Sequence, residues 1–371
     1  MRNTITLSHN ERQIVDVVRN AVGIQRSQLH TKVPLTQPSV HRITDNLVEK
    51  GLLLLGESKA SGPGKPSPEM RINASRYYSV GVVVNTDAIS ICLANLACEA
   101  VANKHVVGHS HDMKQALELV QHVIDEMLQS VPSDTAPEVV GICFSISGFF
   151  AGKRMSTPLP LREWADVDLE DALSQVFDMP IYVENNATSS AIGESLIGVG
   201  RWAQTFAYLS FNYGFGGGII LDGKPYRGAS GNAMEISTIY KTEIMQHRPA
   251  LASLLQLLQS NDIDVQTIAE LRSRFDPAWP GVEDWVVDVL PQLNLAIWAI
   301  RATFDPEVIV FGGEIPEALA YTFMDRVSMY SDDNPRYGIY MPAPKIVYTE
   351  VPNANTALGA AITPLKAQFF P

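Results

Sequence analysis

The sequence predicts an α/β protein with a small helix-turn-helix domain at its N-terminus. Two observations support this fold class. From residue 78 onward, short strand-like runs alternate with helical patterns, which is typical of α/β folds with mixed sheets. Before that point, helical patterns separated by a turn are followed by a stretch rich in Gly, Pro and Ser. The 371 residues are enough for two or three domains.

The first elements along the chain have a helix-turn-helix pattern. Residues 11–21 repeat apolar side chains at helical spacing, and residues 26–32 predict a shorter helix centred on Leu29. Residues 31–35, which contain Pro34, provide the turn.

Residues 36–51 are the most informative stretch, because they have the pattern of a recognition helix that enters the DNA major groove. We expect Thr36 to cap this helix, with its hydroxyl accepting a backbone N–H, and Pro38 to fit the first turn. The apolar face consists of Val40, Ile43 and Leu47. The residues off that face, where base contacts are made, are Gln37, Ser39, His41 and Arg42.

Several basic residues of this region have two open roles. His41 is either a base contact or an exposed helix residue, and Lys50 and Arg19 either touch phosphates or only solvate the domain. The first 70 residues carry nine Lys and Arg against six Asp and Glu, a formal charge of +3, while the whole chain carries −12. Because phosphate attraction is screened within about 10 Å, a basic head on an acidic body fits DNA binding.

Residues 58–68 are rich in Gly, Pro and Ser, which excludes a regular element. Strands are expected on both sides, at residues 52–56 and 70–72. We therefore interpret the stretch as the wing of a winged helix, with Lys65 along a phosphate or in the minor groove. A simple interdomain linker is the alternative.

The remaining chain predicts the α/β body. Expected strands cover residues 78–84, 90–95, 139–145, 180–183, 205–209, 217–221, 308–311 and 345–348. Expected helices cover residues 113–128, 169–176, 188–197, 251–259 and 285–304.

Cysteine content and hydropathy indicate the cellular compartment of the protein. The three cysteines, Cys92, Cys98 and Cys143, are an odd number without metal-ligand spacing, which argues against a disulfide framework and fits a reducing cytoplasm. No apolar run approaches the roughly 18 residues of a membrane helix, and the N-terminus has no apolar signal core.

Several segments together resemble the ROK family, named for repressors, open reading frames and kinases. Residues 23–29 and 35–51 are similar to the DNA-binding helices of its repressor branch, which makes Arg26 a further candidate DNA contact, and residues 64–66 resemble its wing. The other matching segments are residues 158–168, 183–194, 214–229 and 305–313. The resemblance implies an actin-like, ribonuclease-H-like two-lobed sugar kinase fold behind a winged helix-turn-helix domain.

This resemblance sets the expected domain boundaries. Residues 1–70 form the DNA-binding domain. Residues 71–190, completed by a C-terminal helix at 355–371, form the first lobe, and residues 191–354 form the second lobe with a dimerisation surface.

The chain departs from the family's kinases at the residues that carry catalysis. Their Asp-x-Gly loop approaches the ATP phosphates, but this chain has Val83 and Asn85 there, and a β-carbon obstructs that approach. Asn186 replaces their general base, and losing such a base costs about 10²–10⁴-fold in rate. Thr238 replaces a zinc-binding His, and no cysteine follows Cys143, which excludes a thiolate zinc site. We therefore expect no catalytic residues, metal or cofactor.

The expected effector site has four residues. Asn185 and Asn186 suit a sugar, since each amide can donate to one hydroxyl and accept from another, although a polar turn is the alternative. Glu235 has apolar neighbours, so we expect it to be partly buried and to need a donor. The resemblance places Thr157 where it contacts the sugar or orders its loop. We expect the two amides and the carboxylate to lack partners until a ligand binds.

Glycine-rich residues 214–218 allow two interpretations. A phosphate loop and a tight hairpin both need such glycines, and with Val83 and Asn85 nearby the hairpin is favoured.

The sequence therefore predicts a cytoplasmic, sugar-responsive transcriptional regulator, a repressor in particular. Its expected partners are double-stranded operator DNA and a sugar or sugar phosphate, and it is expected to form a homodimer or homotetramer. Two alternatives remain open, an active sugar kinase with a regulatory head and a regulator controlled by a protein partner.

Overall fold

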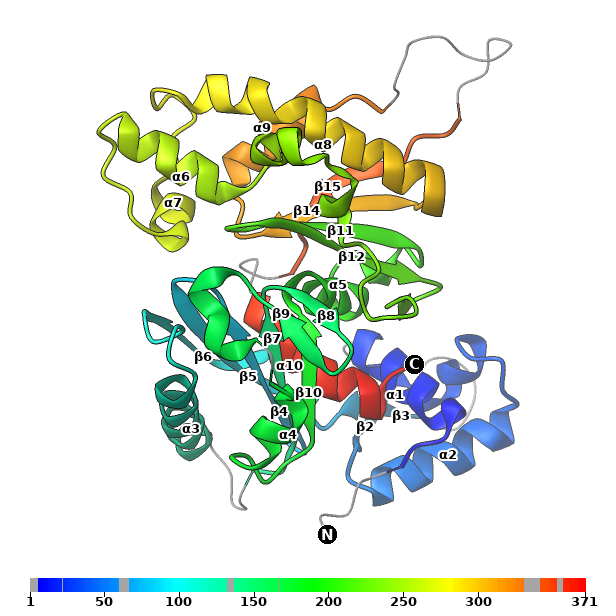
Figure 1. The fold of residues 1–371 in the computed structure, drawn as a ribbon. Coiled ribbons are helices and arrows are strands. Elements are labelled where there is room, and N and C mark those ends of the chain that lie inside the picture. Colours follow the sequence, from blue (N-terminus) through cyan, green and yellow to red (C-terminus); the bar gives the residue numbers. More distant parts are fainter. Residues whose placement is uncertain are drawn as a thin grey trace.

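The computed structural model describes residues 6–21, 23–59, 67–131, 137–165, 167–329, 341–351 and 356–371. It contains a head and two α/β lobes, which are stacked on one another with the head beside the first lobe (Figure 1). This arrangement confirms the predicted fold class. Within the described residues, no helix is long and apolar enough to cross a membrane.

The head has the architecture of a winged helix. Its elements are α1 (His9–Ala21), β1 (Ile24–Gln25), the 3₁₀ helix η1 (Arg26–Thr31), α2 (Gln37–Glu49), β2 (Leu53–Lys59) and β3 (Ser67–Ile72). The strands form one sheet in the order β1-β3-β2, so strands flank the predicted wing on both sides. The expectation that residues 58–68 form no regular element is wrong at its ends, because Ser58 and Lys59 belong to β2 and pair with Pro68 and Ser67 of β3. Gly51 ends α2 with a φ of +72°, a conformation that glycine adopts without strain. Lys65 lies outside the described residues.

The two lobes repeat one strand arrangement. Their sheets have the orders β10-β7-β4-β5-β6 and β13-β12-β11-β14-β15. In each sheet the first strand along the chain is central, pairs antiparallel with the next strand and parallel with a later one. The strands are β4 (Tyr78–Val84), β5 (Ala88–Asn95), β6 (Ala100–Val107), β7 (Val139–Ile146), β10 (Ile181–Asn185), β11 (Phe206–Phe211), β12 (Phe215–Leu221), β13 (Lys224–Pro225), β14 (Val308–Gly313) and β15 (Lys345–Tyr348).

Helices cover the outer faces of both sheets, and two helices lie between the sheets. Those between are α5 (Asn186–Ile197), which packs on β11 and β12, and α10 (Thr356–Phe369), which packs on β4 and β7 (Figure 1). The others are α3 (Met113–Ser130), α4 (Leu169–Ser174), α6 (Leu251–Ser260), α7 (Ile268–Arg274), α8 (Val282–Phe304) and α9 (Glu317–Arg326). A small hairpin, β8 (Phe149–Ala151) and β9 (Arg154–Ser156), and the 3₁₀ helices η2 (Leu159–Trp164), η3 (Val199–Arg201), η4 (Ile236–Ile239) and η5 (Thr242–His247) complete the chain.

The strands and helices predicted from the pattern are present, with ends that differ by at most three residues. The pattern missed β6, because this edge strand is exposed along most of its length and shows no alternation of apolar and polar residues. It also missed the short elements β8, β9 and α7, and the helix α9.

The head and the first lobe share one apolar core. The buried apolar residues of α1 and α2 belong to the same cluster as Leu96 and Cys98 of the first lobe and Phe369 and Phe370 of the C-terminus. Figure 1 shows the C-terminal end of α10 beside α1. The ring of Phe369 stacks on Tyr77 with a centroid distance of 5.1 Å. The head is therefore docked on the body through packed side chains.

Candidate functional site

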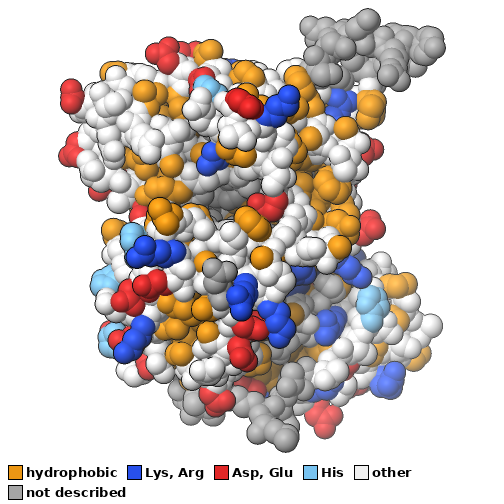
Figure 2. Space-filling model, viewed as in Figure 1, with side chains coloured by type: hydrophobic (Ala, Val, Ile, Leu, Met, Phe, Trp, Pro, Cys, Tyr) orange, Lys and Arg blue, Asp and Glu red, His pale blue; other side chains and the backbone are white. Residues whose placement is uncertain are grey.

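The predicted recognition helix presents its polar face to solvent. Val40, Ile43 and Leu47 are buried, which confirms the apolar face. The residues of the opposite face are exposed at Gln37, His41 and Arg42 and half-buried at Ser39. Lys and Arg side chains are spread over the visible face of the head in Figure 2. This face of α2 is available for a large polar surface such as DNA.

Thr36 is the N-cap of α2, as predicted, but its hydroxyl makes a different bond. The hydroxyl shares a hydrogen bond of 3.0 Å with the Ser39 hydroxyl, and no cap bond to a backbone N–H forms. Pro38 lies in the first turn, where its missing N–H leaves no bond unmade.

Three basic residues of the head are engaged within the protein. Arg26 forms an ion pair of 2.6 Å with Asp45 and donates to the carbonyl oxygen of His41, so it holds η1 against α2. The expectation that Arg19 is a phosphate contact or a solvated charge is wrong, because Arg19 is buried against α5 of the body. Lys50 is half-buried and pairs with Glu11 of α1 at 2.6 Å.

The second site lies where β10 meets α5, close to the second lobe. Asn185 caps α5, since its side-chain oxygen accepts the N–H of Ala187 at 2.8 Å. Its side-chain nitrogen donates to the carbonyl oxygen of Gly148 and lies 3.4 Å from Oε1 of Glu235. The structure thus brings Asn185 and Glu235 together from two different lobes.

Glu235 is half-buried, as predicted, at the start of η4. Burial raises the pKa of its carboxyl above the ordinary value of 4.5. A carboxylate in such a setting gains from a hydrogen-bond donor, and a sugar hydroxyl is one. Thr157 follows the strand β9, and its hydroxyl donates to the carbonyl oxygen of Leu161 at 2.8 Å, so it orders its own loop.

Asn186 faces a different set of partners from Asn185. Its side-chain nitrogen donates to Oδ1 of Asn85 at 3.1 Å and to the Ser147 hydroxyl at 2.9 Å, and its oxygen accepts from Ser145 at 2.9 Å. Asn212, which follows β11 of the second lobe, donates to the same Asn85 oxygen at 3.2 Å. We call Asn85, Asn186 and Asn212 the asparagine clasp.

The asparagine clasp overturns one expectation from the sequence. Asn185 and Asn186 do not lack partners within the protein, because a backbone carbonyl, the amide of Asn85 and the Ser147 hydroxyl accept from their side chains. The expectation failed because the partners of Asn186 come from distant segments, Asn85 from 101 positions away and Ser145 and Ser147 from about 40 positions away. A ligand at this site would therefore exchange hydrogen bonds rather than supply missing ones.

Two further contacts join the lobes beside this site. Arg227 of the second lobe forms an ion pair of 2.7 Å with Glu184, whose side chain is buried at the end of β10. Asn232 makes two hydrogen bonds of 2.7 Å with the backbone of Phe150 in β8. The lobes are thus joined by polar bonds beside this site.

The glycine-rich segment forms a hairpin, which confirms the favoured interpretation. β11 and β12 pair antiparallel around it. A Cβ on Gly218 would lie 2.8 Å from the carbonyl oxygen of Ala187, so this glycine lets the hairpin pack directly on α5.

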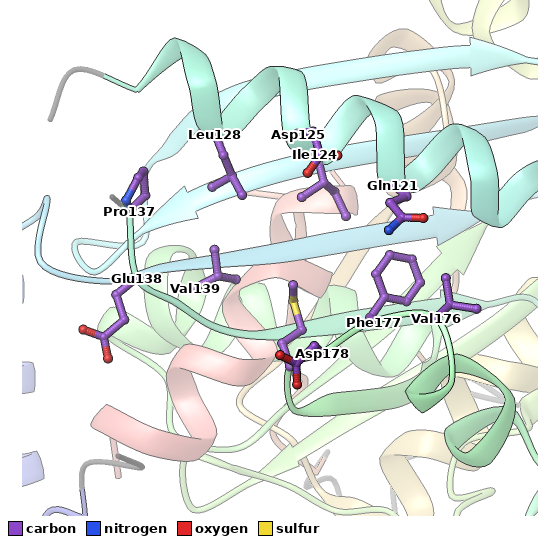
Figure 3. Close-up of a pocket in the computed structure, with 11 residues that line it drawn as sticks. Gln121, Ile124, Asp125, Leu128, Pro137, Glu138, Val139, Val176, Phe177 and Asp178 are labelled. Carbon is purple, nitrogen blue, oxygen red and sulfur yellow. The ribbon is translucent and has the colours of Figure 1, made fainter. Parts of the chain in front are cut away.

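Several cavities of the described residues lie outside the Asn185 site, and two of them border the first lobe. One of about 640 Å³ opens between the lobes, with walls from β5, β6 and α7, and Asn85 of the clasp forms part of its lining. Another of about 500 Å³ lies on the first lobe, between α3, the start of β7 and the turn before β10 (Figure 3). Its lining is apolar at Leu128 and Phe177, and its charged residues are all acidic.

No metal site is visible among the residues that the structure describes. The Thr238 hydroxyl, at the position of the expected zinc-binding His, donates to the carbonyl oxygen of Glu235 at 2.7 Å. All three cysteines are buried and free.

The sequence profile of the ROK family matches residues 79–366. The chain is 27% identical to an uncharacterised protein of Sinorhizobium fredii, over 98% of this chain and 92% of that protein. It is also 27% identical to the xylose repressor of Caldicellulosiruptor bescii, over 63% of this chain and 59% of that protein. The xylose repressor of Staphylococcus xylosus is 22% identical, over 90% of this chain and 91% of that protein.

Solved structures share the fold. A ROK family transcriptional regulator, described as a homologue of the E. coli MLC protein, superposes with a TM-score of 0.69 at 18% identity, over 98% of this chain and 97% of that one. A ROK family glucokinase from Streptomyces griseus, solved with glucose and AMPPNP, gives a TM-score of 0.60 at 17% identity, over 76% of this chain and 98% of that one.

Proposed function

This chain belongs to the ROK family, and on that premise we propose that it is a sugar-responsive transcriptional repressor whose body does not phosphorylate its effector. The observation that carries the proposal is the exposed polar face of α2 on a winged head that is docked onto a ROK body. Relatives named xylose repressors support the same function. We infer that Gln37, Ser39, His41 and Arg42 contact operator DNA, with Arg26 holding α2 in place.

The proposal is tested by selecting DNA duplexes from a random pool with the full chain. We expect one sequence class to be enriched and to bind at least a thousandfold more tightly than unselected DNA, as specific DNA-binding proteins do. Binding is then repeated with D-xylose, other aldoses and their phosphates. A pool without enrichment, or affinities that no sugar changes, would contradict a sugar-responsive repressor.

We expect no sugar kinase activity. Asn186 cannot take a proton from a sugar hydroxyl, and its amide is already held by Asn85 and Ser147. A coupled assay with Mg·ATP and a panel of pentoses, hexoses and amino sugars should match the rate without protein. Asn186→Asp alone should not restore activity, because Asn85 still places a β-carbon where the phosphates need a glycine and Val83 still replaces the aspartate of that loop. ADP release that disappears when the cleft is mutated would favour the alternative, an active kinase.

The proposed effector residues are Asn185, Asn186, Glu235 and Thr157. Among them, Glu235 offers the sharpest test. Glu235→Ala removes a charged acceptor, and such hydrogen bonds contribute about 1.5–3 kcal/mol, so the affinity should fall by roughly ten- to a hundredfold. The measurement is calorimetric titration with D-xylose as the first probe. Glu170→Ala, an exposed carboxylate of α4, is the matched control. Equal affinities of the two variants would place the sensor pocket elsewhere.

We also infer a homodimer or homotetramer in the cytoplasm. Two recognition helices would then meet half-sites separated by whole turns of DNA. Exposed apolar side chains of the second lobe, including Val287 at 59% and Ile239 at 37% exposure, support a dimerisation surface there. Free, buried thiols suit a reducing compartment.

A further inference from the structure

Two arginines of α1 hold the C-terminal ends of two body helices. Arg19 donates from Nη2 to the carbonyl oxygen of Leu196 in α5 at 3.0 Å. Arg12 donates from Nη1 to the carbonyl oxygen of Ala367 in α10, also at 3.0 Å. The last carbonyls of a helix have no partner within the helix, and cations are stabilised at this end. Both arginines therefore act as helix caps supplied by the head.

Arg19 has a fixed orientation at this junction. Its side chain is buried, with the guanidinium 5.0 Å from the ring centre of Phe370. The same guanidinium bonds to Oδ1 of Asp16, from Nη2 at 2.7 Å and from Nε at 3.2 Å. Because Asp16 and Leu196 lie on opposite sides of the junction, α1 cannot turn relative to α5 without breaking one of these bonds.

Both capped helices begin at the junction between the lobes. α5 starts at Asn186 of the asparagine clasp, and α10 starts at Thr356, whose hydroxyl donates to Glu314 of the second lobe at 3.2 Å. At 1.5 Å per residue, the 12 residues of α5 span about 18 Å and the 14 residues of α10 about 21 Å. Each helix thus reaches from the cleft to the head without an intervening loop.

The two helices are packed too closely to move separately. A Cβ on Gly193 of α5 would lie 2.9 Å from Cα of Gly359 in α10, and a Cβ on Gly359 would lie 2.7 Å from the carbonyl oxygen of Ser189. Within α5, Ser195 is the one residue that is not buried. Closely packed elements shift between discrete arrangements rather than deform continuously, so a displacement at one end reaches the other.

We propose that α5 and α10 transmit the state of the cleft between the lobes to the DNA-binding head, and that Arg19 is the positioning residue through which the change reaches the head. This inference rests on the proposed function and adds the residues that couple its two sites. A change in the angle between the lobes moves the first turns of α5 and α10. The C-terminal carbonyls of these helices then move Arg19 and Arg12, and α2 moves together with α1. An effector shifts this equilibrium only through its different affinities for the two states.

A double-mutant cycle on the full chain tests the coupling. Asn212→Ala removes the second lobe from the asparagine clasp without touching α5 or the head. Arg19→Lys keeps a positive charge but loses the planar group that bridges Asp16 and Leu196. The measurements are hydrogen exchange of the α1 amides and the Kd for the duplex selected from random DNA. Arg19→Ala is made as well, and thermal unfolding identifies any variant that does not fold.

We expect Asn212→Ala to change the exchange rates of the α1 amides and the Kd for the selected duplex at least threefold when Arg19 is present. With Arg19→Lys, the same substitution should change each of them by less than 1.5-fold. Uncoupled sites at this distance give nearly additive effects. Equal changes in both backgrounds, or no change in the wild-type background, would therefore overturn the inference. Lys114→Ala, an 87% exposed cation of α3, is the control in place of Arg19→Lys and should leave the coupling intact. A coupling lost with Lys114→Ala as well would also overturn it.

The two measurements separate this inference from the proposed function. Hydrogen exchange needs neither DNA nor sugar, so it decides the coupling even if no duplex is selected. If no duplex is selected but the effects on hydrogen exchange are coupled, the proposed repressor function is rejected and the coupling through α5 and α10 is supported. Selection of a duplex with additive effects would keep the repressor and reject the coupling.

Discussion

Phe369→Ala is expected to lower the free energy of unfolding by about 3–5 kcal/mol, the usual loss when a buried phenylalanine is truncated. Phe369 is fully buried at the end of α10, where its ring stacks on Tyr77 and belongs to the core shared by the head and the first lobe. The cavity would open between the two units, so both should lose stability. Denaturant unfolding measures the loss, and hydrogen exchange shows where it falls.

The expected pattern of exchange is specific to a shared core. Amides of α1 and of α10 should lose protection together in Phe369→Ala. The matched control is Phe149→Ala, which truncates a ring that is 47% exposed and should cost less than about 1 kcal/mol. Loss of protection in α10 with unchanged protection in α1 would show that the head folds independently. The shared core also means that deleting residues 1–70 exposes apolar surface, so point substitutions are the better test of DNA binding.

Arg42→Ala is expected to weaken binding of the selected duplex by about 1–3 kcal/mol, roughly five- to 150-fold, if its guanidinium meets a base edge. Arg42 is exposed on the polar face of α2, so its removal should leave the fold intact. The affinity for unselected DNA decides the kind of contact. An equal loss on both DNAs would assign Arg42 to phosphates, and no loss on either would remove it from the interface. Lys114→Ala is the control for a lost positive charge.

The chain order of polar and apolar residues determined much of the fold. Val40, Ile43 and Leu47 recur at the helical period, so the buried and exposed faces of α2 follow from spacing alone. The strands predicted at residues 78–84 and 345–348 have the same bounds as β4 and β15 of the structure. The glycines of residues 214–218 likewise predict the hairpin from the sequence alone.

Asparagine in the place of catalytic residues was also visible in the sequence, through its resemblance to the ROK family. Asn85 and Asn186 stand where the family's kinases have a glycine and an aspartate. What these amides do instead was not visible. Their mutual hydrogen bond joins residues 101 positions apart, and the bond from Asn212 to Asn85 spans 127 positions. Sequence spacing carries no information on such pairs.

Only the tertiary structure decided the roles of Arg19 and Arg26. Spacing alone places Arg42 on the polar face of the recognition helix, whereas it gives no role to Arg19, and Arg26 is a candidate DNA contact only through the resemblance to the ROK family. In the fold, Arg42 faces solvent, Arg26 pairs with Asp45, and Arg19 caps a helix whose carbonyl lies 177 positions away. The physical reason is that periodicity fixes which face of an element is apolar, whereas the partner of a polar group depends on which elements the folded chain brings together.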